Sequence, residues 1–321
     1  MSHVPSSRFR EILALCAALS AFAANSLLSR WAMSRCAMDP AGFGSIRLLS
    51  AALTLLALTL LSGQGLRALG GRWSSALLLC VYAFCFSFAY VELSTGAGAL
   101  ILFGLVQVTM LGGAVEEGHR FSAGQLAGGV LALAGLFSLL APGWQAPSLR
   151  GALLMAAAGL AWGLYSLRGR ASGDPMRETT GNFLRSIPAV LVVAALAVNR
   201  TRLDSSGVLM AVFSGGAATG LGYVVWYWAL KRISSARAAW LQLLVPLLSA
   251  VGGLVFLGEP FSMRLLASGA LMVGGLAIIL VVGEPGRYGR GGATGVWMVG
   301  TRRMLSDSVL PPLLTPTRKR L

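Results

Sequence analysis

Ionisable side chains within the long apolar segments of this sequence require a chemical explanation for their position. A charge at the centre of a bilayer costs at least about 2.5–3.5 kcal/mol on insertion scales. A proton-driven exporter of cationic compounds normally needs a buried carboxylate that exchanges a proton for its substrate. The sequence disfavours that mechanism, because every acidic residue falls in a loop or at the end of an apolar segment. The eleven are Glu11, Asp39, Glu92, Glu116, Glu117, Asp174, Glu178, Asp204, Glu259, Glu284 and Asp307.

Side chains that would support catalysis or metal binding are scarce. The two histidines are His3, near the N-terminus, and His119, in a loop. The cysteines, Cys16, Cys36, Cys80 and Cys85, lack the spacing of zinc or redox sites. No glycine-rich loop with a lysine is present to hold nucleotide phosphates. We therefore expect neither an enzyme nor an ATP-driven pump, and we expect no cofactor and no metal site.

Three arginines lie in apolar segments or at their ends. Arg47 and Arg185 each fall a few residues into a segment, and Arg237 begins the ninth one. A guanidinium group fits a carboxylate with two parallel hydrogen bonds, so these residues could pair with a substrate carboxylate at a gate. Alternatively, their long side chains reach the lipid headgroups. Both interpretations remain open.

Amide side chains in apolar segments predict a polar interior. Asn25, Gln107 and Gln242 carry donors and acceptors that lipid cannot satisfy. We expect all three to face the inside of a helix bundle and to bind substrate.

Aromatic side chains repeat at helical spacing in two segments. Residues four apart share one face of a helix, which predicts rings that stack on an organic substrate or hold a cation. The alternative is anchoring at the membrane surface or helix packing. The first set is Tyr82, Phe86 and Tyr90, and the second is Tyr223, Trp226 and Tyr227.

Pro246 interrupts the ninth apolar segment. A proline inside a helix removes one backbone hydrogen bond and bends the chain. In transporters a broken helix often marks a hinge or the binding site. We predict a hinge at Pro246, with a simple packing kink as the alternative.

The elements that must position these residues are transmembrane helices. Hydrophobic residues make up 56% of the 321 residues and charged residues 12%, far from the quarter that is charged in soluble domains. Apolar helices of about 20 residues can cross the ~30 Å hydrocarbon core of a bilayer. We predict an all-α membrane protein with ten spans, near residues 11–29, 43–62, 74–93, 98–115, 124–141, 151–167, 182–199, 207–229, 237–257 and 265–283.

An internal repeat organises these spans. Residues 94–140 and 234–280 share 15 of 47 residues when aligned without a gap, among them Gly112/Gly252 and Gly135/Gly275. Repeats within a membrane protein are typical of transporters whose halves move about a site at their interface. The same 140-residue offset aligns the first apolar run, near residues 11–29, with the sixth, near residues 151–167. We therefore interpret the first run as a transmembrane helix rather than a cleaved signal peptide.

The distribution of basic residues sets the orientation. With the N-terminus in the cytoplasm, inside loops carry eleven Lys or Arg against six outside, before the tail is counted. Five spans per half is an odd number, so the halves must be inverted relative to one another. We predict a cytoplasmic N-terminal tail (1–10), a first repeat (11–141), a connecting loop (142–150), a second repeat (151–283) and a cytoplasmic, disordered, basic tail (284–321).

The net charge of +15 follows this placement rather than indicating nucleic acid. Basic residues of the tail either contact anionic lipid or simply remain solvated. The predicted partners are a small-molecule substrate and membrane lipid, with a homodimer left open. The predicted location is a bacterial inner membrane.

Several motifs resemble the drug/metabolite transporter superfamily, in particular its EamA-type branch. They are Ser234-Ser235-Ala236-Arg237, Leu244-Val245-Pro246-Leu247, Leu257-Gly258-Glu259-Pro260 and Gly269 to Gly275. The resemblance implies ten helices in two five-helix repeats, and it extends over about residues 10–283. Trp162-Gly163-Leu164-Tyr165 resembles the aromatic patch of a repeat's first helix, which adds Tyr165 to the candidate substrate-binding residues. Asn25, Arg47 and Arg185 stand at matching family positions. Val106 and His119 depart from the pattern where the second half has Pro246 and Glu259.

The sequence as a whole favours a secondary transporter that moves a small organic metabolite by alternating access. Export of an amino acid or a related compound is the leading hypothesis. A proton-coupled exporter of multiple drugs or cationic compounds is the first alternative. A non-transporting membrane scaffold or sensor with the same fold is the second.

Overall fold

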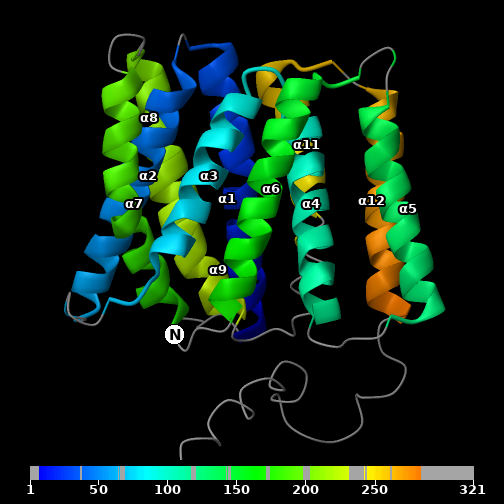
Figure 1. Cartoon of the computed structure of the whole chain (residues 1–321), viewed down its shortest axis with the longest axis horizontal. Helices are drawn as coiled ribbons and strands as arrows, with labels where there is room; N and C mark the ends of the chain where they lie inside the picture. The colour runs from blue at the N-terminus through cyan, green and yellow to red at the C-terminus, as the bar shows by residue number, and fades with distance from the viewer. Residues whose placement is uncertain are drawn as a thin grey trace, which may run out of the picture. The chain divides into compact units, whose positions relative to one another are not determined.

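Helices form all the regular structure in the described part of the chain (Figure 1). The structure is a computed structural model, and it describes residues 7–36, 38–63, 65, 69–116, 121–141, 143, 146–170, 174–197, 203–230, 242, 244–260 and 262–282. The helices are α1 (Ser7–Ser34), α2 (Pro40–Leu61), α3 (Trp73–Ala89), α4 (Thr95–Glu116), α5 (Ala123–Leu140), α6 (Leu149–Arg170), α7 (Pro175–Ala197), α8 (Ser205–Val212), η2 (Phe213–Leu221), α9 (Gly222–Leu230), α11 (Leu244–Leu257) and α12 (Met263–Val282). Because α8, η2 and α9 are continuous, these helices correspond to the ten predicted spans.

The outer surface of the bundle is apolar. On α5, Leu126, Val130 and Phe137 are each more than half exposed. Ser87 and Thr180, by contrast, are fully buried. Small and hydroxyl residues inside and large apolar ones outside are what lipid as a solvent requires. By length and composition alone, five of the described helices could cross a membrane, and four shorter helices are also apolar. The chain is a multi-pass membrane protein.

Most helix packing joins the first half of the chain to the second. α5 packs on α12, α4 on α11 and α2 on α7. α3 packs on α6, and α1 packs on α9 and η2. The paired helices α5 and α12 stand together at one edge of the bundle, and α1 begins on the same side as α12 ends (Figure 1). The two halves are therefore interleaved, and space between them lies among α1, α3, α4, α6 and α9.

Acidic residues at the ends of spans cap helices. Asp39 precedes Pro40 at the start of α2, and its Oδ2 accepts from the Gly42 amide at 2.7 Å. Asp204 does the same for α8 through the Gly207 amide at 3.0 Å. A carboxylate here satisfies free N–H groups and interacts favourably with the helix dipole.

The eighth span contains a π-helical segment, η2, between two α-helical parts. Such segments are rare and occur frequently at functional sites. Gly215 in η2 lies against α2, where a Cβ atom would collide with the Arg47 carbonyl oxygen and the Ser50 hydroxyl. The wider turn and this glycine together let η2 and α2 approach closely.

Several predictions lie outside the described residues. They concern Arg237, the side chain of Tyr227 and the tail from Glu284 onward. Pro246 is described, as the third residue of α11. Gln242, four residues earlier, is also helical, so a hinge or kink at Pro246 remains a prediction.

Candidate substrate-binding cavity

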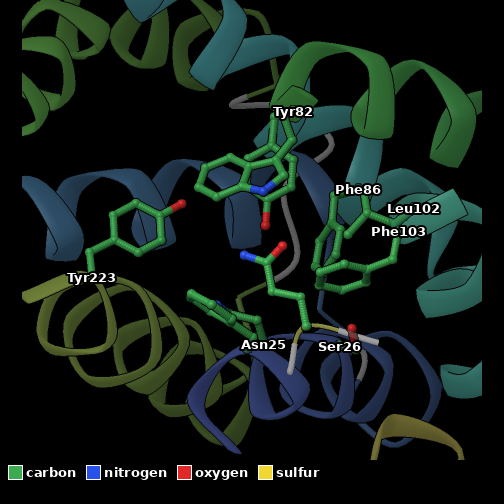
Figure 2. Close-up of a pocket in the computed structure, with 10 residues that line it drawn as sticks. Asn25, Ser26, Tyr82, Phe86, Leu102, Phe103 and Tyr223 are labelled. Carbon is green, nitrogen blue, oxygen red and sulfur yellow. The ribbon is translucent and has the colours of Figure 1, made fainter. Parts of the chain in front are cut away.

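A narrow cavity lies between the two halves of the chain (Figure 2). The volume in which the centre of a water molecule fits is only about 20 Å³. In Figure 2, Asn25 and Ser26 of α1 lie across the cavity from Tyr82, and Phe86, Phe103 and Tyr223 form its sides. Its full described lining is Phe22, Asn25, Ser26, Tyr82, Phe86, Leu102, Phe103, Trp162, Tyr223 and Gln242.

Aromatic rings form a continuous chain around the cavity. Trp162 of α6 is central, with its ring centroid 5.0 Å from that of Tyr82 and 5.3 Å from that of Tyr223. Phe22 of α1 continues the chain to Trp226 at 5.5 Å. Rings at these separations stabilise one another and present faces and edges to an organic ligand. The cavity thus offers an apolar, polarisable wall built by both halves.

Asn25 is held in one orientation by the second half. Its Oδ1 accepts from the Ser214 hydroxyl at 2.8 Å and from the Thr219 hydroxyl at 3.3 Å. Both hydroxyls belong to η2, and all three side chains are buried. Because the carbonyl oxygen is engaged, the NH₂ group is the part of the amide left to face the cavity. Asn25 is therefore presented as a hydrogen-bond donor.

Arg47 lies directly behind the cavity wall. It is 2% exposed, and its guanidinium carbon is 4.6 Å from the ring centroid of Phe86 and 5.0 Å from that of Tyr82. Its Nη2 donates to the Tyr82 hydroxyl at 2.8 Å. Its Nη1 is buried without a hydrogen-bond partner. The side chain is therefore turned into the protein rather than toward lipid headgroups.

Arg185 has a different environment from Arg47. Its Nη1 donates to the backbone carbonyls of Gly70 and Gly181 at 2.6 and 3.0 Å. The neighbouring Asn182 side chain accepts from the Arg72 amide at 2.8 Å. These bonds attach α7 to the segment before α3. Arg185 thus binds the segment before α3 to α7, and it does not line the cavity.

A polar cluster connects the halves on the side where α1 ends and α4 begins. Glu259, after α11, accepts from the Thr95 amide at 2.9 Å and from the Thr95 hydroxyl at 3.1 Å. Arg30 of α1 forms an ion pair with Glu259 at 3.3 Å and donates to the Tyr90 carbonyl at 2.9 Å. Tyr90 is fully buried and packs on Phe86 of the cavity wall. The cluster of Arg30, Tyr90, Thr95 and Glu259 therefore contacts the cavity wall through Tyr90.

Comparison with known proteins identifies the family. The model of the EamA-like transporter family matches residues 149–281. An uncharacterised protein of Pseudomonas aeruginosa is 45% identical over 284 residues, which cover 88% of this chain and 99% of that protein. The chain belongs to the EamA-like transporter family. The resemblance to this branch of the drug/metabolite transporters is thereby confirmed, and a small-molecule transporter is supported.

Other relatives of this EamA-family chain carry functional names. A probable amino-acid metabolite efflux pump of Salmonella typhimurium is 28% identical over 69% of this chain and 76% of its own length. The threonine/homoserine exporter RhtA of Escherichia coli K12 is 30% identical over 48% of this chain and 54% of its own length. A solved crystal structure shares the fold with a TM-score of 0.59 and 21% identity, over 84% of this chain and 98% of that one.

The EamA-family cavity contains some of the predicted site residues and not others. Asn25, Phe86, Tyr223 and Gln242 line it. Tyr90, Tyr165 and Trp226 are buried and pack on lining rings, Tyr165 by stacking on Trp162 at 5.6 Å. Gln107 is half-buried and Arg185 is bound to backbone, and neither lines the cavity.

Sequence reasoning missed part of the lining. Ser26 follows Asn25, and Phe103 lies one turn before Gln107, so position relative to the amides was a usable signal for both. Leu102 offers no such signal, because apolar residues are common throughout α4. Trp162 was noted only for its family position, and Phe22 was not among the predicted site residues.

Proposed function

We propose that this chain is a secondary transporter that exports amino acids or closely related metabolites by alternating access. It works in a bacterial inner membrane, with both termini in the cytoplasm as the basic loops predict. Two relatives named as an amino-acid metabolite efflux pump and a threonine/homoserine exporter support this substrate class. The coarser family assignment supports transport itself.

The cavity between the halves carries the proposal. Its lining comes from α1, α3 and α4 of the first half and from α6, α9 and Gln242 of the second. The cavity is narrow as it stands. A substrate can enter only if the halves separate on one side, which is the motion that alternating access requires.

An inverted repeat is the architecture that best accounts for the helix packing. The contacts of α2 with α7, α4 with α11 and α5 with α12 join corresponding helices of the two halves. The contact of α3 with α6 corresponds to that of α1 with α9 when the halves are exchanged. The matched region 149–281 also agrees with a second repeat over 151–283.

A flux screen in proteoliposomes tests this function. We expect uptake or release of one or more radiolabelled amino acids, including threonine and homoserine, above protein-free vesicles. Gln242→Ala removes a lining amide, and it should lower flux by about 10-fold, the effect of one lost polar contact. Gln107→Ala is the matched control and should change flux less than twofold. Substrate binding without flux would instead favour a sensor, and flux of organic cations alone would favour the drug exporter.

A further inference from the structure

Arg47 is a buried cation without a described counterion. It is 2% exposed, and Nη1 has no hydrogen-bond partner. Within the described residues the salt bridges belong to Arg30, Arg150 and Arg177, so none reaches Arg47. An uncompensated charge inside a membrane protein is costly, and such residues usually mark a substrate or ion pathway. The unsatisfied nitrogen points to an anionic ligand.

The position of Arg47 connects it with the cavity. Both rings over which its guanidinium lies, Tyr82 and Phe86, line the cavity. The Tyr82 hydroxyl oxygen accepts the Nη2 hydrogen of Arg47 at 2.8 Å. A phenol oxygen that accepts a hydrogen bond still has its own proton to donate. Tyr82 thus presents a donor to the cavity, strengthened by the cation behind it.

The other polar groups of the lining suit the same ligand. Asn25 presents its NH₂ group, since Ser214 and Thr219 occupy its oxygen. The described lining contains no Asp or Glu that would repel an anion. The remaining wall is aromatic and suits the apolar body of a small molecule. Tyr82, with the positive charge of Arg47 behind it, and Asn25 across the cavity both offer donors that a carboxylate can accept from.

We propose that Tyr82, with Arg47 directly behind it, binds the carboxylate group of the transported substrate. This rests on the proposed export of amino acids or related metabolites, and it makes the carboxylate the group that the cavity selects. Arg185 serves as the internal comparison. Its guanidinium is occupied by the Gly70 and Gly181 carbonyls, so it has no corresponding role.

The test pairs a change in the ligand with a change in the protein. Binding to purified protein is measured by the rise in melting temperature, for phenylacetate against phenylacetamide and for L-phenylalanine against L-phenylalaninamide. Flux of the same phenylalanine pair is measured in proteoliposomes. Wild type should prefer each acid by about 10- to 100-fold, the usual effect of a charge-assisted hydrogen bond. In Arg47→Met and in Tyr82→Phe the ratio should fall close to one, whereas Arg47→Lys should keep part of it and Arg185→Met all of it.

The ratio of acid to amide separates binding from mere structural damage, because a poorly folded variant loses both ligands equally. The ligand-free melting temperature of Arg47→Met gives a second readout. It should stay unchanged or rise, since an unpaired buried charge is replaced by an apolar side chain of similar length.

The outcomes also separate this site from the proposed function. Arg47-dependent binding of carboxylates without flux of any amino acid would support the site and reject export. Equal flux of acid and amide would reject the site and leave export standing. An acid preference that survives in Arg47→Met, or no binding of any carboxylate to wild type, would overturn the site.

Discussion

Single side chains of the cavity are oriented by partners that are distant in sequence. Asn25 of α1 depends on Ser214 and Thr219 of η2, which lie 189 and 194 positions later. An amide with a free oxygen and a free nitrogen could bind donors or acceptors alike. Fixing its oxygen turns Asn25 into a donor, and this selects for acceptor groups on the substrate.

Removing these two hydroxyl groups should therefore impair selectivity more than folding. In Ser214→Ala combined with Thr219→Val, the Asn25 amide is free to rotate, and we expect flux of the preferred amino acid to fall about 10-fold. Stability should decrease by about 1–3 kcal/mol for two lost neutral hydrogen bonds. Ser249→Ala is the matched control, because its buried hydroxyl has no partner and its loss should be neutral. Equal flux defects in both variants would argue against an orienting role.

At this scale the sequence was informative for two of the three amides singled out in apolar segments, the exception being Gln107. Asn25 and Gln242 were predicted to face the interior, and both line the cavity. The buried state of Arg47 was not predictable, because it depends on how α3 places Tyr82 and Phe86 over α2. A guanidinium at that depth could equally reach headgroups if no rings covered it.

At the scale of helices, the length of an apolar run decides whether a transmembrane helix can be predicted from the sequence. All ten predicted spans correspond to helices, because each long apolar run has one stable form in lipid. The π-helical segment η2 was not predicted, since its hydrogen-bond pattern leaves no periodic signal in the apolar residues. The segment is stabilised from outside, by the close contact of Gly215 with α2. Its effect is to turn Ser214 and Thr219 toward α1.

The cluster of Arg30, Tyr90, Thr95 and Glu259 joins four elements, so breaking it should loosen one side of the bundle. Glu259→Gln keeps the size of the side chain but removes its charge at the start of α4. Because Arg30 and Glu259 are only 22% and 14% exposed, we expect a loss of about 1–3 kcal/mol of unfolding free energy.

The matched control for this change is Glu92→Gln, which lies on the same side. Its partner Arg150 is 75% exposed, so this ion pair should contribute less than about 1 kcal/mol. Both are measured by denaturant unfolding in detergent, together with labelling of a cysteine placed at Ser26 by a membrane-impermeant thiol reagent. Glu259→Gln should raise that labelling rate. An unchanged rate would show that the cluster does not close this side.

Over the whole molecule, the interleaved halves explain why a small cavity can control transport. Each half contributes aromatic rings and an amide, so neither forms the site alone. The helix pairs that surround the cavity also join the halves, so in the proposed mechanism a change in their packing would open or close the site. The asymmetry noted in the sequence has a physical counterpart, since Glu259 of the second half caps α4 of the first.

The absence of carboxylates from the described lining leads to a prediction about energy coupling. Exchange of one proton for one substrate needs a group in the site that releases its proton when the substrate binds. We therefore expect flux of a zwitterionic amino acid to be insensitive to a pH gradient when the membrane potential is clamped. With strict one-for-one exchange, a gradient of one pH unit would instead drive about tenfold accumulation, because each pH unit corresponds to 1.36 kcal/mol. Proteoliposomes with potassium and valinomycin distinguish the two outcomes, and tenfold accumulation would require a titrating group that participates in transport.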